Sequence, residues 1–241
     1  MKKILNKITV TGADDTTSID DLYQIQKKYP FVEFGILIRS SETIKSSFFS
    51  RFPSLKWLNE LAIKSRETRL NLSMHLCGDP VFDILENGRL PDHILRIAYQ
   101  RIQINTHGEP HKYNYYEKFF PELRRNFNTT FIFQLDGVNQ HLMYDSAREG
   151  ITNISGLYDL SHGAGVVPDN WIKDPEDGLY YGYAGGLSPK NVAFQLSKIE
   201  TFNKIIYVLP LNTLVDQTNL ELQNNFEFKN NKINIVNSEQ H

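Results

Sequence analysis

The stretch ITVTGADDTTSIDDLYQIQKKYPFVEFGILI (residues 8–38) decides the fold. Its β-branched run 8–11 predicts a strand that ends in a Gly turn. Ser18, with Asp21 three residues later, is typical of a helix N-terminus, and the following residues have helical spacing. The apolar run 32–38 then predicts a second strand. A strand, a helix and a strand in succession predict two parallel strands joined by a crossover helix.

The same alternation of strand and helix continues along the chain. Further strands are predicted at residues 70–76, 101–105, 130–135, 154–160, 179–183 and 204–209. Further helices are predicted to open at Pro53, to span about 115–126 and 139–148, to start at Ser188-Pro189, and to lie within 229–236. This pattern predicts one domain over residues 1–241, an α/β fold with eight strand–helix units closed into a (β/α)8 TIM barrel. An open doubly wound sheet is the alternative, but no G-x-G-x-x-G motif follows the first strand.

Length and composition agree with a single barrel and exclude several classes. The chain has 241 residues, and a barrel of this type takes about 250. A net charge of −2 gives no basic surface for nucleic acid. Cys77 is the only cysteine, so an internal disulfide and a cysteine zinc site are both excluded, which fits a reducing, cytoplasmic compartment. No run of eighteen apolar residues predicts a membrane span, and 1–9 predicts a strand rather than a signal peptide.

Polar residues collect where the predicted strands end. In a barrel, the loops after the strands form the active-site face, so these residues are the candidates for function. They are Thr11, Asp14, Asp15, Arg39, His75, Cys77, Gln103, Asn105, His107, Gln134, Asp136, Asp159 and Asn212. Cys77 in such a position is more often a small buried hydrophobic residue than a reactive thiol.

The loop after the predicted seventh strand, residues 184–192, suggests a phosphate site. Gly185 and Gly186 would let a ligand approach the backbone closely, and a helix that begins at Ser188-Pro189 would present free N–H groups. Barrels commonly bind phosphate at this place. An ordinary Gly turn before a helix is the competing interpretation.

These motifs resemble phosphoribosylanthranilate isomerase. Residues 185–192 look like the Gly-Gly-Leu-x-Pro-x-Asn-Val phosphate loop of that family, and 159–165, followed by Asn170-Trp171, resembles the region after its sixth strand. Arg51 to Ser54 resembles the start of its second helix, and 102–105 is similar to its fourth strand. The likeness extends over roughly residues 8–200.

The resemblance implies an Amadori rearrangement of an aminoaldose phosphate, without a cofactor or a metal. Asp159 matches the general acid, although a carboxylate that caps a loop would look the same. Thr11 stands where the family has its basic cysteine, and a threonine hydroxyl is a very poor base. Asp14 or Asp15 would then be the base, or else turn residues. Arg51 matches the residue that pairs with the anthranilate carboxylate, and a surface arginine is the alternative.

The substrate would also contact Asn105, Gly185, Gly186 and Asn212. Residues 209–213 after the eighth strand lack the family's Ser-Gly pair, so half of the phosphate cradle is altered. We therefore expect a small phosphorylated metabolite as partner, no nucleic acid or membrane, and a monomer or homodimer. The alternatives to the isomerase are a non-catalytic barrel that kept a phosphate pocket, or a barrel enzyme of different chemistry. A metal site at His75 and His107 is geometrically conceivable but not expected, since no metal motif supports it.

Overall fold

The computed structural model describes residues 4–40, 51–106, 115–137, 139–159, 165–173, 175, 177–188, 190–199, 205–210 and 227–228. The strands are β1 (Ile4–Thr11), β2 (Val32–Ile38), β3 (Leu72–Cys77), β4 (Arg101–Asn105), β5 (Thr130–Gln134), β6 (Ile154–Asp159), β7 (Tyr180–Ala184), β8 (Ile205–Pro210) and β9 (Glu227–Phe228). The helices are α1 (Ile19–Lys28), α3 (Leu55–Thr68), α4 (Asp79–Asn87), α5 (Phe119–Arg125), α6 (Gln140–Arg148) and α7 (Val192–Ser197).

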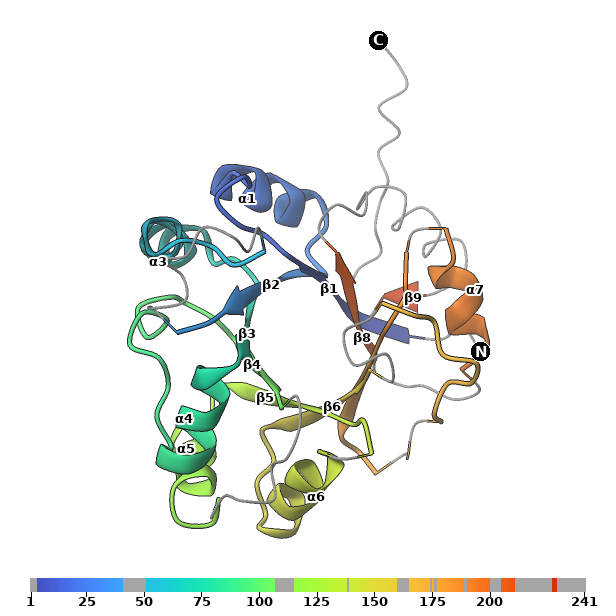
Figure 1. Ribbon diagram of the computed structural model, residues 1–241. Coiled ribbons are helices and arrows are strands. Elements are labelled where there is room, and N and C mark those ends of the chain that lie inside the picture. Colours follow the sequence, from blue (N-terminus) through green and yellow to red (C-terminus); the bar gives the residue numbers. More distant parts are fainter. Residues whose placement is uncertain are drawn as a thin grey trace.

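Strands β1 to β8 form a closed parallel barrel, as the sequence predicts. Each strand pairs with the next one along the chain, and β1 pairs with both β2 and β8, which closes the ring. The helices lie around the outside of this ring (Figure 1). The short strand β9 pairs in parallel with the first residues of β1. The chain is therefore an α/β TIM barrel.

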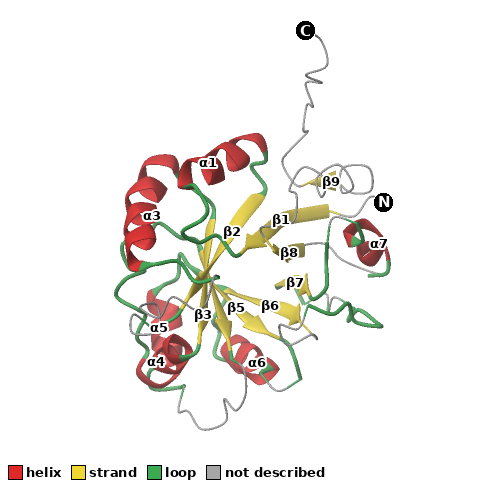
Figure 2. Ribbon diagram, turned by 45° about the horizontal axis from the view of Figure 1, so that its top comes forward, coloured by secondary structure: helices red, strands yellow, loops and turns green. Residues whose placement is uncertain are grey.

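Alternate residues of each strand face opposite sides of the barrel wall. On β3, Leu72, Met74 and Leu76 belong to the main hydrophobic core beneath the helices. Ser73 and His75 between them are also buried, because they face the interior of the barrel. The molecule therefore has an apolar core between strands and helices and a second, more polar set of side chains inside the ring. Figure 2 shows the helices outside the strands.

Helix starts depend on local capping, and the sequence predicts one of three correctly. Ser18 caps α1, and its side chain accepts a hydrogen bond from the Asp21 N–H, as expected. Helix α3 starts after Ser54 rather than at Pro53, because the Ser54 side chain accepts from the Trp57 N–H. The predicted helix start at Ser188-Pro189 is wrong, since α7 begins only at Val192.

The late start of α7 has a physical cause in the loop before it. The Asn191 side chain accepts from the Ser188 N–H at 2.8 Å and donates to the Gly186 carbonyl at 2.9 Å. These bonds tie Asn191 to Gly186 and Ser188, so the helix begins only after Asn191. Helix α5 is also shorter than predicted and begins at Phe119. The last predicted helix, at 229–236, lies outside the described residues.

Candidate functional site

The candidate residues meet at the carboxyl rim of the barrel. Thr11 ends β1, Asn105 ends β4 and Asp159 ends β6. Asp159 is paired with Ala184, the last residue of β7, and Gly185 follows it directly. Because all these strands are parallel, their ends lie on the same rim. The sequence prediction that Asp159 and the Gly-Gly loop share one end of the barrel is therefore confirmed.

Thr11 lies inside the barrel next to His75. Its side chain is 7% exposed. A Cβ placed on Gly35 would lie 2.7 Å from Thr11 Cγ2 and 2.8 Å from His75 Nε2. Gly35 therefore leaves the space in which Thr11 and the imidazole approach one another. The residue at the expected position of the base thus has a buried histidine as its neighbour.

Asp14 and Asp15 hold the loop after β1 in shape. Asp14 Oδ1 accepts from the Thr16 N–H at 2.9 Å and from the Thr16 hydroxyl at 2.6 Å. Asp15 accepts from the Ser54 N–H at 2.6 Å and also from the Ser54 hydroxyl. These contacts are those of turn residues and a loop-to-helix link. They favour the structural interpretation of both carboxylates over the role of a base.

Two arginines bring positive charge to the rim near β3. Arg51 lies on an exposed turn before α3, and the guanidinium of Arg39 lies 4.3 Å from the centre of the Phe52 ring. Burial raises the pKa of the Cys77 thiol above its ordinary value of 9.0, whereas a hydrogen bond from Asn105 and the charges of Arg39 and Arg51 oppose that rise. The thiol stays protonated at neutral pH and is a poor base.

Asn105 is engaged within the protein. Its carbonyl oxygen accepts from the Gln103 amide at 2.6 Å, and its amide donates to Cys77 Sγ at 3.2 Å. The side chain is buried at the rim, between two inward-facing neighbours. Its described hydrogen bonds therefore fix the end of β4.

The Gly185-Gly186 turn is shaped by packing inside the protein. Gly185 and Gly186 have φ angles of 105° and 62°, which favour glycine. A Cβ on Gly186 would lie 2.3 Å from the Val167 backbone nitrogen, so the segment after β6 fills that side of the turn. The Ser188 N–H, which we expected to be available at a helix start, is bonded to Asn191.

Below the rim, a buried ion pair crosses the interior. Glu33 on β2 and Arg101 on β4 are hydrogen bonded through two contacts, one of them 2.8 Å long. Burial alone would raise the pKa of Glu33, but the charges of Arg101 and Lys7 and the hydrogen bonds from Arg101 and Thr9 hold it at about 2. The sequence interpretation missed this pair, although charged residues at inward positions of strands are a signal for it.

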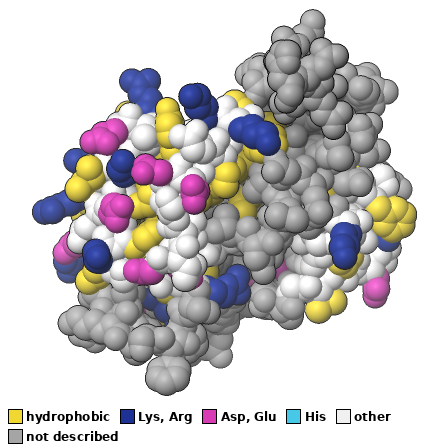
Figure 3. Space-filling model, turned by 90° about the horizontal axis from the view of Figure 1, so that it is seen from above, with side chains coloured by type: hydrophobic (Ala, Val, Ile, Leu, Met, Phe, Trp, Pro, Cys, Tyr) yellow, Lys and Arg dark blue, Asp and Glu magenta, His cyan; other side chains and the backbone are white. Residues whose placement is uncertain are grey.

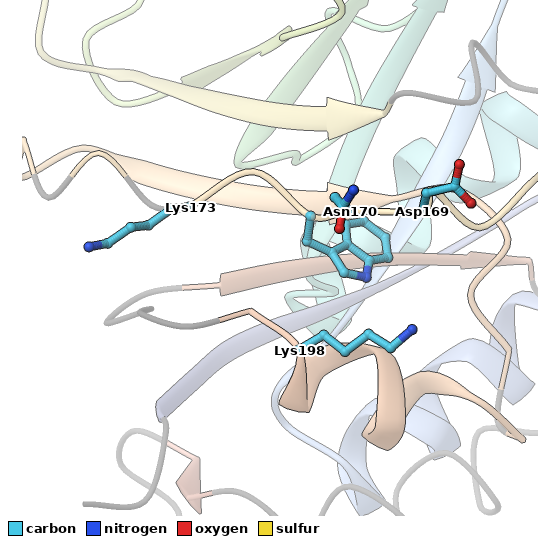
Figure 4. Close-up of a pocket in the computed structure, with 5 residues that line it drawn as sticks. Asp169, Asn170, Lys173 and Lys198 are labelled. Carbon is cyan, nitrogen blue, oxygen red and sulfur yellow. The ribbon is translucent and has the colours of Figure 1, made fainter.

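A separate cavity of about 610 Å³ lies outside the barrel. It is lined by Asp169, Asn170, Trp171, Lys173 and Lys198. The Trp171 ring packs edge-on against Tyr183 with centroids 5.7 Å apart, and its indole N–H donates to Gln195 on α7. Figure 4 shows Lys173 and Lys198 extending in different directions. Trp171 therefore packs against the outer face of β7 rather than at the rim.

Two candidates, His107 and Asn212, lie outside the described residues. Within the described part of the chain, no group of three His, Cys, Asp or Glu side chains is arranged to hold a metal ion. Among those residues, no helix is long and apolar enough to cross a membrane. Seen from above, acidic and basic side chains are interspersed on the described surface (Figure 3).

Solved structures match this fold. N-(5'-phosphoribosyl)anthranilate isomerase from Pyrococcus furiosus matches with a TM-score of 0.50 and 13% identity, over 91% of this chain and 99% of that one. The chain has a barrel of the phosphoribosylanthranilate isomerase type. Phosphoribosylanthranilate isomerase from Thermotoga maritima matches with a TM-score of 0.47 and 13% identity, over 84% of this chain and 87% of that one. Thiamine phosphate pyrophosphorylase from Pyrococcus furiosus matches with a TM-score of 0.48 and 10% identity, over 92% and 96%. No family model and no curated protein matches the chain.

The likeness to the phosphoribosylanthranilate isomerase barrel is one of fold. A match at 13% identity supports the arrangement of the strands and the position of the rim. It assigns no role to any residue. The inward-facing His75, Gln103 and Gln134, like Ser73 and Ser155, each have a buried polar atom without a hydrogen-bond partner among the described residues. Their sequence signal was a polar residue near each strand end.

Proposed function

We propose that this chain is an isomerase of a phosphorylated aminosugar, with Asp159 as its general acid. The observation that carries the proposal is the placement of Asp159 beside the strand that leads into Gly185-Gly186. A carboxyl group and a glycine turn on adjacent strands would hold the reacting end and the phosphate end of one small ligand. The single cysteine fits a cytoplasmic enzyme.

The reaction needs an acid and a base at different points of the sugar. The acid gives a proton to the ring oxygen, which opens the ring and leaves an iminium at C1. The base then takes the proton from C2, the electrons of that bond form a C1=C2 double bond, and the iminium electrons move to the nitrogen, which gives an enaminol. The enaminol becomes the aminoketose when C1 gains a proton and the C2 hydroxyl group loses one. Asp159 is half-buried at the rim, where it can supply the first proton. Arg39 and Arg51 would attract a carboxylate on the amine half of the substrate.

The phosphate would bind at the backbone of Gly185 and Gly186. A test at Gly186 itself would disturb the contact with Val167, so Ser188 is the better position. Ser188→Asp adds a negative charge next to the turn without a new Cβ, and Ser188→Asn is the neutral control of similar shape. We expect the Asp variant to bind inorganic phosphate about tenfold more weakly than the Asn variant. Equal affinities would exclude this turn as the phosphate site.

The chemical role of Asp159 is tested with phosphoribosylanthranilate as substrate. Asp159→Asn keeps the shape but cannot donate the proton, so turnover should fall about 100-fold or more. Asp14→Asn is the matched control, because Asp14 holds a turn on the same rim. Turnover is measured by chromatography of the product, and it should be the same in Asp14→Asn as in the wild type. Activity that survives in Asp159→Asn would remove Asp159 from the mechanism.

A non-catalytic barrel that binds a sugar phosphate is the second candidate. It is favoured by the lack of an evident base, since Thr11 is a hydroxyl, Asp14 is held in a turn and the Cys77 thiol is protonated. Phosphate binding without any turnover, in the wild type and in Thr11→Cys alike, would support this candidate.

A further inference from the structure

The barrel interior is polar along one side. His75 on β3, Gln103 on β4 and Gln134 on β5 face inward, and their side chains are 2%, 5% and 4% exposed. We name these three residues the polar arc. They lie on three successive strands, so they form a continuous part of the inner wall.

Each member of the polar arc has an unused hydrogen-bonding atom. His75 Nε2, Gln103 Oε1 and Gln134 Oε1 are buried and have no partner among the described residues. A buried polar group left unpaired costs about 1–3 kcal/mol. Three such atoms on adjoining strands are rare in folded proteins unless water or a ligand pairs with them. The arc therefore favours an occupant with hydrogen-bonding groups.

The occupant of the arc would be uncharged. Two members are amides, and burial lowers the pKa of His75 to about 4, so the imidazole is neutral at pH 7. The nearest buried charges, Glu33 and Arg101, are paired with one another beneath the arc. Neutral amides and a neutral imidazole suit hydroxyl groups, which both donate and accept hydrogen bonds.

A small apolar group lies beside the polar arc in the barrel interior. Ile132, Leu157 and Ala184 form a small buried cluster that is separate from the main core. They come from β5, β6 and β7 and face inward; we name them the apolar wall. A sugar carries hydroxyl groups at its edges and C–H groups on its faces, so a wall of each kind matches it.

The arc lies directly beneath the rim. Strands in a barrel are staggered, so side chains from alternate strands meet in one layer. The strand register puts Thr11, His75, Gln134 and Ala184 in one layer. Asp159 and Asn105 belong to the next layer toward the rim. A group that enters past Asp159 would therefore meet His75 and Gln134 first and Gln103 one layer deeper.

We propose that the polar arc and the apolar wall together bind the uncharged, hydroxyl-bearing part of a monosaccharide derivative. This deepens the proposed function, because the sugar of the same ligand would enter here while its phosphate stays at the rim. The arc is thereby a binding element for the sugar and takes no part in proton transfer.

The experiment compares three probes: ribitol 5-phosphate, ribitol and inorganic phosphate, each titrated by calorimetry. We expect ribitol 5-phosphate to bind the wild type about tenfold or more tightly than inorganic phosphate. Gln134→Leu should weaken the binding of ribitol 5-phosphate about tenfold, because it removes one buried hydrogen bond to the sugar. The affinity for inorganic phosphate should stay unchanged. This variant removes an unpaired acceptor and should fold at least as well as the wild type. Ser155→Ala is the control, because Ser155 also has an unpaired inward hydroxyl but lies in the layer of Glu33.

A second readout needs no variant at the arc. The ring resonances of His75 should shift in the wild type with ribitol 5-phosphate and not with phosphate. Equal affinities for ribitol 5-phosphate and phosphate, or an unchanged affinity in Gln134→Leu, would overturn the inference and leave the arc a water site only. Binding of ribitol that depends on Gln134, without any phosphate binding, would refute the phosphate site alone and support the arc. Failure of all three probes to bind would overturn both.

Discussion

The guanidinium of Arg101 donates two hydrogen bonds to the carboxylate of Glu33 inside the barrel, across 68 residues of sequence. The Thr9 hydroxyl donates to the same carboxylate at 2.9 Å, and Lys7 pairs with it at 3.3 Å. The pair joins β2 to β4 across the strand that separates them. Neutralising one partner leaves the other buried without compensation.

Glu33→Gln should therefore lower the free energy of unfolding by about 3–5 kcal/mol at pH 7. The folded pKa of about 2 lies below the ordinary value of 4.5, so the ionised carboxylate stabilises the fold. This contribution is fully present above about pH 4.5 and is lost as the pH falls toward 2. Urea unfolding at several pH values should show the difference between wild type and variant shrinking across that window. A difference that stays constant with pH would contradict the ionised pair.

His75 should give a pH dependence of the same direction as Glu33, but in a higher pH window. Burial lowers its pKa from 6.5 to about 4, against the charge of Glu33, which raises it. Between these values the unfolded chain binds a proton that the folded chain does not, so the stability falls as the pH drops from 6.5 to 4. The full loss is about 3 kcal/mol relative to His75→Gln, which has no such proton. Unfolding curves of both proteins at several pH values measure this loss, and an NMR titration gives the pKa of the His75 ring. A ring that titrates near 6.5 would contradict this prediction.

Gly186 is predicted to be required by protein packing. Gly186→Ala combines an unfavourable φ with a clash against Val167, so we expect a loss of about 2–4 kcal/mol. Gly12→Ala is the matched control, because Gly12 also has a positive φ of 98° but nothing within 4 Å of an added Cβ. The control should lose only about 1 kcal/mol, from backbone strain. The loss of stability is measured by thermal unfolding. Equal losses in Gly186→Ala and Gly12→Ala would show that the contact with Val167 is unimportant.

The sequence predicts what depends on neighbouring residues. The bounds of β2 and β4 and the cap at Ser18 agree with the structure, because strand alternation and capping are local. The sequence does not predict which residues that are distant along the chain come into contact. A Gly-Gly turn looks the same whether a phosphate or Val167 fills its open side, and an aspartate such as Asp14 looks the same as a base or as a turn residue. Only the folded chain shows which partner each has.

Thr11→Cys tests whether the barrel can catalyse the isomerisation at all. Thr11 is the last residue of β1 and is paired with Gly35, so a cysteine there would place its sulfur at the barrel rim, in the layer below Asp159. A thiolate is a far better base than a hydroxyl, so turnover of phosphoribosylanthranilate should rise about tenfold or more. Thr11→Ser is the control, because it keeps the hydroxyl and removes only the methyl group near His75. The gain should follow the ionisation of the thiol, with a rise in rate as the pH approaches the pKa of the new cysteine. If Thr11→Cys and Thr11→Ser have the same turnover while both bind ribitol 5-phosphate as the wild type does, then the residue at this position takes no part in proton transfer. A wild type that is active in that case has its base elsewhere on the rim, and an inactive one is a binding protein.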